Sequence, residues 1–307
     1  MNAQASDVVI RYIRTKNKTR KLATYRTDDC VLRVQHQKIN QFLSERFIPS
    51  IFTKGYTKGR SIYHNAYAHL YNDYFIMMDI KDFFPHICHK QLAEKIYYEI
   101  NLVKPNQISR LECKNIVELC SINSRGLPLG FITSPLLSNI YLKEFDGVFY
   151  GQLKQFGVSN LIYTRYADDL TVSFQWKAAE APSFVDDIAQ LASKLLSRYG
   201  LQLNRQKTRS YNLNVSNHVR VTGINITKDG ASKRRLTVGR SAKNELFWRA
   251  MECIKTNDEA EIAYLKGMQA FILSVEKTGY EDCYSEQMME LVRANGFPTL
   301  KEMIDSL

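Results

Sequence analysis

LIYTRYADDLTVSF, residues 161–174, decides the fold, because it has the pattern of a β-hairpin. Apolar and aromatic residues fill both arms, and the polar tip carries two adjacent carboxylates, Asp168 and Asp169. Neighbouring carboxylates on an apolar hairpin repel each other and lose hydration, and a multivalent cation relieves that repulsion. Such hard oxygen ligands suit Mg²⁺ or Mn²⁺. Ala-Asp-Asp is also common in ordinary surface turns, so the hairpin alone leaves both interpretations open.

A third carboxylate comes from FIMMDI, residues 75–80, which is short and apolar and predicts a buried strand. Asp79 stands near the end of this strand, where an unpaired carboxylate would be costly. On a strand next to the hairpin, Asp79 would complete a pocket for two metal ions roughly 3.5–4 Å apart, which is the arrangement of metal-assisted phosphoryl transfer. A strand-end cap or an ion-pair partner is the alternative role for Asp79.

Helical periodicity covers much of the remaining chain, whereas residues 219–227 predict a further strand pair and residues 126–135 a loop rich in Gly and Pro. Strands and helices are interspersed without a βαβ rhythm, so the predicted fold class is α+β. The predicted helices cover residues 31–48, 89–100, 107–121, 135–153 and 183–199, and the region from about 241 to the end.

The 307 residues carry a net charge of +11. A surplus of this size favours polyanionic partners, because each neutralised phosphate releases counterions, although a merely soluble basic protein is the alternative. The six cysteines are scattered without a CxxC pair, which indicates neither a disulfide framework nor a thiolate zinc site and fits a reducing cytoplasm. The sequence has no signal-peptide core and no run of 18 apolar residues, so we expect a cytoplasmic location and no membrane partner.

Eight blocks between about residue 19 and residue 275 resemble the motifs of reverse transcriptases, and most closely those of bacterial retron reverse transcriptases. NAYAH and VTG match the NAxxH and VTG elements of retrons in particular. The blocks are TRKLATYRTDDCVLRVQHQKI (19–39), GYTKGRSI (55–62), NAYAH (65–69), FIMMDIKDFFPHI (75–87), GLPLGFITSPLLSNIYL (126–142), YTRYADDL (163–170), LNRQKTR (203–209) and VTG (221–223).

The resemblance implies catalytic roles at matching positions. Asp79, Asp168 and Asp169 would ligate two Mg²⁺ ions, for which Mn²⁺ is an alternative, and the Ile80 carbonyl would be a further metal ligand. Lys207 matches a lysine that would protonate the departing pyrophosphate, a general-acid role. A solvated loop lysine is the alternative interpretation of Lys207.

The resemblance also implies contacts to the incoming nucleotide. Phe84 matches the residue whose ring lies under the sugar and excludes a 2′-hydroxyl, although a core aromatic is the alternative. The chain departs from many relatives at Leu129, where they carry Gln, and at Phe131, where they carry a small residue. Backbone groups of Gly130 and Phe131 would then compensate for the missing Gln. The implied nucleotide-binding residues are Arg20, Lys21, Phe84, Gly130, Phe131 and Ala167.

Contacts to template and primer are implied by the remaining motifs and by the basic stretch after VTG, because Lys and Arg bind phosphates. The implied nucleic-acid-binding residues are Lys58, Arg60, Asn65, His69, Val221, Thr222, Gly223, Arg234 and Arg235.

The fold implied by the resemblance is a right-hand polymerase. Fingers are expected at 1–76 with a contribution from 100–128, a palm of a small antiparallel sheet backed by helices at 77–230, and a largely helical thumb at 231–307. The implied activity is RNA-directed DNA synthesis by two-metal nucleotidyl transfer from deoxynucleoside triphosphates. The implied partners are a structured non-coding RNA, its RNA-linked single-stranded DNA product and a separate effector protein of an anti-phage defence system.

Three alternatives remain at this point. An RNA-dependent RNA polymerase would share the palm chemistry, but Ala167 and Phe84 favour DNA synthesis. A group II intron-like reverse transcriptase would normally add a maturase region after the thumb, and a diversity-generating or other bacterial reverse transcriptase is part of the same alternative. A non-catalytic RNA-binding scaffold would be indicated by loss of a metal-binding Asp, and none is lost.

Overall fold

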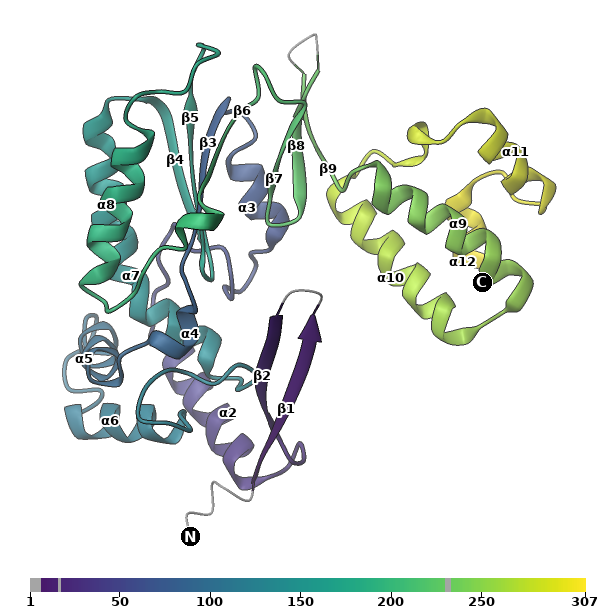
Figure 1. The fold of residues 1–307 in the computed structure, drawn as a ribbon. Helices are drawn as coiled ribbons and strands as arrows, with labels where there is room; N and C mark the ends of the chain where they lie inside the picture. Colours follow the sequence, from purple (N-terminus) through teal and green to yellow (C-terminus); the bar gives the residue numbers. More distant parts are fainter. Residues whose placement is uncertain (1–6, 16–17, 230–232) are drawn as a thin grey trace. The chain divides into compact units, whose positions relative to one another are not determined.

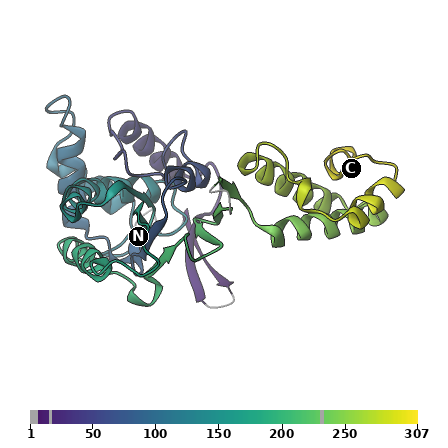
Figure 2. The same cartoon turned by 90° about the horizontal axis from the view of Figure 1, so that it is seen from above.

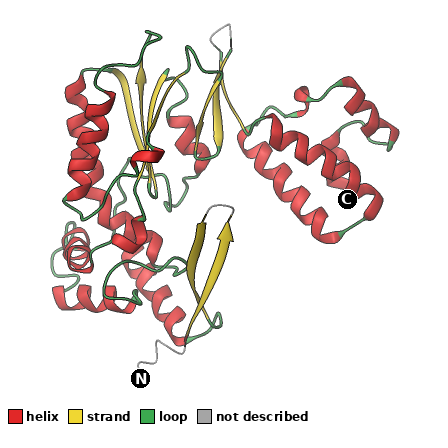
Figure 3. Ribbon diagram, in the orientation of Figure 1, coloured by secondary structure: helices red, strands yellow, loops and turns green. Residues whose placement is uncertain are grey.

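The computed structural model describes residues 7–15, 18–229 and 233–307 (Figure 1). The chain divides into two compact units: Met1–Ser61 with Asp73–Tyr211, and Ile62–Asn72 with Asn212–Leu307. Basic and acidic residues are equal in number in the second unit, so the surplus of +11 belongs wholly to the first. Helices are mixed with small antiparallel sheets, which confirms the predicted α+β class (Figure 3).

A four-stranded sheet with strand order β4-β5-β3-β6 forms the centre of the first unit. β4 (Ser159–Tyr166) and β5 (Asp169–Gln175) are the arms of the predicted hairpin. β3 (Tyr74–Asp79) is the predicted buried strand, and it pairs antiparallel with β5. β6 (Arg209–Asn212) completes the sheet beside β3.

Two helices, α7 (Ser134–Leu153) and α8 (Val185–Ser197), cover one face of this sheet (Figures 1 and 2). α8 buries the apolar stripe that its sequence predicts and leaves Asp186 and Asp187 exposed in its first turn, where a helix dipole favours negative charge. α7 is buried on several sides, because both α5 and α8 contact it. The main hydrophobic core lies between these helices and the sheet.

Most of the remaining elements of the first unit lie around the end of the sheet at which β3 terminates, whereas the 3₁₀ turn at Lys154–Phe156 leads into β4 at the opposite end. The helix predicted at 31–48 ends earlier, at Ser44. Phe47 continues the apolar spacing of the helix and therefore suggested a longer one, but it is buried from the segment that follows the helix. These elements are β1 (Val8–Thr15), β2 (Lys18–Tyr25), α2 (Val31–Ser44), α4 (Phe83–His86), α5 (His89–Ile100), α6 (Arg110–Leu119) and the 3₁₀ turns η1 (Lys154–Phe156) and η2 (Arg205–Lys207).

The second unit combines a three-stranded sheet, on which α3 (Ile62–Ala68) packs, with a group of helices. β7 (His218–Val221) and β8 (Ile224–Lys228) are the predicted strand pair. β9 (Arg234–Thr237) was not predicted, since its basic residues were interpreted as contacts to template and primer at the start of a largely helical region. It is an edge strand, where basic residues discourage further pairing. The helices are α9 (Arg240–Thr256), α10 (Glu259–Val275), α11 (Glu286–Ala294) and α12 (Leu300–Ser306), with the 3₁₀ turn η3 (Glu281–Cys283).

Candidate active site

The three predicted aspartates meet at one end of the four-stranded sheet. Asp79 is the last residue of β3 and is directly opposite Asp169, the first residue of β5. Residues directly opposite each other in an antiparallel pair have Cβ atoms about 4.5–5.5 Å apart. Asp168 lies in the turn between β4 and β5, and its carbonyl accepts a hydrogen bond of 2.9 Å from the Ile80 N–H. The fold therefore gathers carboxylates from two distant segments of the chain.

The electrostatics of the aspartates reflect this crowding. Desolvation, and then the negative charges of Asp168 and Asp79, raise the pKa of Asp169 to about 6. Desolvation also raises the pKa of Asp168, and the charge of Asp79 adds to that rise. Lys207 and Arg20 act in the opposite direction on Asp168. The site thus holds more negative charge than its surroundings neutralise.

Lys207 lies on η2, which the backbone holds beside Asp79. The Asn204 N–H donates to the Asp79 carbonyl at 2.7 Å, and Ile80 forms a β-bridge with Leu203. The Lys207 Nζ then reaches Asp79 Oδ2 at 2.9 Å. This hydrogen bond, with the charges of the three aspartates, raises the pKa of Lys207, so the ammonium form is favoured. In the sequence only the family resemblance links Lys207 to Asp79, whereas the structure brings the two side chains into contact.

The donor set fits hard divalent cations, because it consists of carboxylate oxygens with few competing bonds. Within the described ranges, however, no three His, Cys, Asp or Glu side chains are already gathered around a common point as metal ligands. Asp79 is buried, Asp168 is half-buried and Asp169 is exposed, so the group opens toward solvent.

Phe84 lies on α4, which follows Asp79 by one short loop. Its buried ring meets the ring of Tyr56 edge to face, with centroids 6.4 Å apart. Burial and the charge of Asp168 both raise the pKa of Tyr56, which places its hydroxyl within electrostatic reach of that aspartate. Tyr56 is half exposed and was missed by the sequence analysis. Its backbone φ of 57° is rare for a non-glycine residue and could not be inferred from the sequence.

The loop between α6 and α7 is held against β2. Gly130 has φ of 104°, and a Cβ atom there would lie 2.4 Å from the Ala23 carbonyl, so the position requires glycine. The Ala23 N–H donates to the Leu129 carbonyl at 2.7 Å. The Phe131 ring is buried and stacks on Tyr25, the last residue of β2, with ring centroids 5.3 Å apart. Only the backbone of Phe131 is left for the predicted nucleotide contact, which stays a prediction.

A hydrogen-bonded chain passes through the same aromatic cluster. The Ile132 N–H donates to the Tyr25 hydroxyl at 3.1 Å, and that hydroxyl lies 2.7 Å from Nδ1 of the buried His36. His36 Nε2 lies 3.1 Å from the Leu119 carbonyl. Desolvation lowers the pKa of His36. A neutral imidazole with its proton on Nε2 satisfies both contacts, so the cluster ties β2, α2, α6 and the loop together.

The predicted basic contacts lie on exposed segments of the first unit. Arg20 on β2 is close enough to Asp168 to lower its pKa. Lys21 lines a cavity of about 250 Å³ together with Arg125 and Leu129. Lys58 and Arg60 are exposed in the segment before α3. Ala167 is buried beside Asp168 and has φ of 56°.

The predicted retron elements come together in the second unit. The Asn65 amide on α3 donates to the Thr222 hydroxyl at 3.3 Å, in the turn between β7 and β8. Thr222 and Gly223 both have positive φ, which explains the glycine in this turn. His69 and Val221 are fully buried, so their side chains belong to the interior of the unit.

The two basic residues of β9 differ in exposure. The Arg234 guanidinium donates to the carbonyls of Leu70 and Asn72, whereas Arg235 is exposed. Direct contact with nucleic acid stays a prediction for all the residues of these elements.

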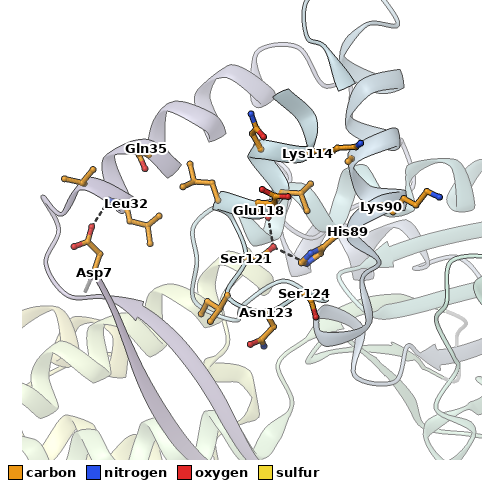
Figure 4. A pocket seen from close by; sticks show the side chains of 16 residues that line it. Asp7, Leu32, Gln35, His89, Lys90, Lys114, Glu118, Ser121, Asn123 and Ser124 are labelled. Carbon is orange, nitrogen blue, oxygen red and sulfur yellow. Dashed lines mark hydrogen bonds between the residues drawn. The ribbon is translucent and has the colours of Figure 1, made fainter. Parts of the chain in front are cut away.

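A larger pocket, of about 980 Å³, lies away from the aspartates, along α2, α5 and α6 (Figure 4). His89 Nε2 lies 2.8 Å from the Gly126 carbonyl and 3.1 Å from the Ser121 hydroxyl. The pocket carries both Lys90 and Glu118 and has no cluster resembling the aspartates. We therefore place the candidate chemistry at the end of β3 rather than in this larger space.

Comparison with known proteins agrees with this geometry. The family model described as reverse transcriptase (RNA-dependent DNA polymerase) matches residues 14–226, which include the three aspartates. The retron Ec86 reverse transcriptase of Escherichia coli is 29% identical, over 77% of this chain and 66% of that protein. The retron Mx65 reverse transcriptase of Myxococcus xanthus is 27% identical, over 71% of this chain and 50% of that protein. The chain thus spans about half to two thirds of the length of these relatives.

A solved structure extends the comparison to the fold. Apo telomerase from Candida tropicalis, truncated from its C-terminal domain, superposes with a TM-score of 0.52 at 13% identity. The match covers 72% of this chain and 53% of the telomerase chain. No helix in the described part of the chain combines the length and apolar character needed to cross a bilayer. On the match to more than half of its length, the chain belongs to the reverse transcriptase family.

Proposed function

We propose that this chain is the RNA-directed DNA polymerase of a retron, which copies part of a cognate non-coding RNA into RNA-linked single-stranded DNA. The observation that carries the proposal is the meeting of Asp79 and Asp169 across β3 and β5, with Asp168 beside them and Lys207 in contact. The retron assignment rests on the names of the curated relatives and on the NAYAH and VTG elements.

The chain's own residues would divide the work of nucleotidyl transfer. Asp79, Asp168 and Asp169 would hold two divalent cations, Mg²⁺ or Mn²⁺, with the Ile80 carbonyl as a further ligand. When bound, such ions lower the pKa of an attacking 3′-hydroxyl and stabilise the leaving pyrophosphate. Lys207 is favoured as the ammonium form, so it would donate a proton to the pyrophosphate oxygen.

Selection of deoxynucleotides would fall to Phe84. Its ring is fixed against Tyr56 and follows Asp79 closely in the chain, so a ribose 2′-hydroxyl would meet a rigid apolar surface. Arg20 and Lys21 would contact the triphosphate, and Ala167 with the backbone of Gly130 and Phe131 would border the base and sugar.

The architecture we propose is a right hand. Fingers would comprise 1–76 with 100–128, the palm 77–230 and the thumb 231–307. The first unit carries the whole positive surplus, which supports phosphate binding there through residues such as Lys58 and Arg60. The neutral second unit would recognise RNA by shape and hydrogen bonding more than by charge, through Thr222, Gly223 and Arg235. The buried Asn65, His69 and Val221, and Arg234 with its bonds to backbone carbonyls, would support that surface from within the unit.

The biological setting we propose is a cytoplasmic anti-phage defence system. The partners would be the structured RNA that serves as template, its single-stranded DNA product and a separate effector protein. These proposals rest on resemblance to the retron family.

Expression together with the neighbouring non-coding region tests the proposal. The purified chain should carry single-stranded DNA that shifts in size after ribonuclease treatment, and it should extend a primed RNA with deoxynucleotides but not with ribonucleotides. Asp168→Asn with Asp169→Asn should abolish both, whereas Asp187→Asn on the exposed turn of α8 should abolish neither. Polymerisation that survives the double substitution would refute the assignment of the aspartates, and an active chain without RNA-linked DNA would refute the retron.

A further inference from the structure

Arg165 is the bulkiest side chain with no solvent exposure in the part of the chain that the structure describes. It lies on β4, inside the apolar arm of the hairpin, three residues before Asp168. Burying a guanidinium costs several kcal/mol unless its charge and all its donors are matched. The hydrogen-bond acceptors around Arg165 therefore determine whether its burial is tolerated.

Each of the five guanidinium N–H groups has an acceptor. Nε and Nη2 bind the two carboxylate oxygens of Asp146 on α7 at 2.8 and 2.9 Å, and Nη2 also donates to the Thr53 hydroxyl at 2.9 Å. Nη1 donates to Asn139 Oδ1 and to the Ala167 carbonyl, both at 3.2 Å. Asp146 further accepts from the Tyr163 hydroxyl at 2.8 Å. The buried ion pair therefore leaves no guanidinium N–H of Arg165 without an acceptor, and both carboxylate oxygens of Asp146 accept hydrogen bonds.

The bond to Ala167 links this interior network to the turn that carries the aspartates. Ala167 has φ of 56°, a left-handed conformation that an alanine adopts at a cost of about 1 kcal/mol. Its carbonyl is held by Arg165, and its N–H side is closed by Gly55, where a Cβ atom would lie 2.8 Å from the Ala167 nitrogen. Asn139 joins the two restraints, since it accepts from Arg165 and donates to the Gly55 carbonyl at 3.0 Å.

We infer that Arg165 is a positioning residue for Asp168 and Asp169: its guanidinium fixes the backbone of the turn from which the two carboxylates would reach a bound cation. The inference rests on the proposed function. A buried ion pair is weak evidence of stabilisation, because apolar residues of similar volume often replace it without loss. Apolar residues cannot, however, replace the fixed N–H donors by which the guanidinium holds the backbone of the turn. The position of that turn matters, because a displacement of about 1 Å in a reacting site lowers rates about 10²-fold.

Arg165→Lys in the full chain is the main test, because lysine keeps the charge but lacks the planar array of donors. We expect the dissociation constant for Mn²⁺, measured by electron paramagnetic resonance without nucleotide, to rise about tenfold. The Mg²⁺ concentration for half-maximal activity should rise to a similar degree, and kcat should fall about 10²-fold while KM for deoxynucleotides changes little. Phe145→Leu, in the buried core of α7, is the matched control: it should lower the unfolding midpoint and leave the Mn²⁺ dissociation constant within twofold of wild type.

A second variant covers the case in which Arg165→Lys does not fold. Asn139→Ala leaves the bonds between Arg165 and Asp146 intact and removes the link to Gly55, so it should weaken Mn²⁺ binding about threefold. Folded Arg165→Lys, or in its absence Asn139→Ala, with wild-type Mn²⁺ affinity would overturn the positioning role while the proposed function stands. A wild-type chain that neither binds Mn²⁺ nor polymerises would overturn both.

Discussion

Replacing Asp169 by Asn tests whether the crowded carboxylates destabilise the chain in the absence of cations. The folded pKa of Asp169 is about 6, whereas an ordinary Asp titrates near 3.8. The folded state therefore holds the proton more tightly than the unfolded state does. The stability that Asp169 contributes is complete below pH 3.8 and is lost as the pH rises through about 6, so at pH 8 its charge opposes folding.

The size of the effect follows from these values. The difference between 3.8 and about 6 corresponds to about 3 kcal/mol at about 1.36 kcal/mol per pKa unit. Asp169 is exposed, so solvent screening reduces the effect to about 1 kcal/mol. For a unit of this size, about 1 kcal/mol moves Tm by about 2–4 °C.

Thermal unfolding in a chelator at pH 8 measures the effect. Asp169→Asn should raise Tm by about 2–4 °C, and the gap should close as the pH approaches 4, where both chains are neutral at this position. Added Mg²⁺ should stabilise the wild type more than the variant, which should also lose primer extension. Asp187→Asn, at an exposed position on α8, should not raise Tm. A lower Tm for Asp169→Asn in chelator at pH 8 would show that the carboxylate stabilises the metal-free fold and would refute the reasoning.

Three further substitutions probe the surrounding residues. Lys207→Met removes the partner of Asp79 and should lower kcat about 10²-fold with little change in KM, measured by single-nucleotide incorporation; an unchanged kcat would exclude the general-acid role. Leu129→Gln adds a side-chain amide while the backbone hydrogen bond from Ala23 to the residue 129 carbonyl remains. It should lower KM for deoxynucleotides about fivefold, which corresponds to one hydrogen bond. A higher KM would mean that the side chain at this position does not face the nucleotide. Phe131→Ala empties the aromatic cluster and should cost about 3–5 kcal/mol in urea unfolding of the first unit, and a loss below about 1 kcal/mol would show that the cluster is loosely packed.

Much of the central four-stranded sheet could be predicted from local pattern. The hairpin at 161–174 and the strand that ends at Asp79 are short, apolar and bounded by turn residues, so periodicity alone locates them. Their pairing could be inferred only from the need to gather the carboxylates. The register that sets Asp79 against Asp169 depends on how the two strands pack on α7 and α8, which no local pattern encodes.

Other features of the site depend on contacts distant in sequence. Arg165 sits at a position where the hairpin pattern predicts an ordinary strand residue, and its burial makes sense only with Thr53, Asn139 and Asp146 around it. The orientation of the Phe131 ring likewise cannot be inferred from the sequence of its loop, because the ring packs against Tyr25 and His36, which are distant in the chain. Sequence therefore located the acidic residues but not the interior network that holds them.

The shared bonds of Tyr25 have a mechanical consequence. One phenol is the acceptor for the loop at Ile132 and the neighbour of His36 on α2, while the strand that bears it is pinned at Ala23 to Leu129. A molecule that pulls the loop by even a fraction of an ångström must drag the β1–β2 hairpin with it or break several bonds at once. Binding of the proposed nucleotide to the loop would therefore also displace the β1–β2 hairpin, and binding to the hairpin would displace the loop.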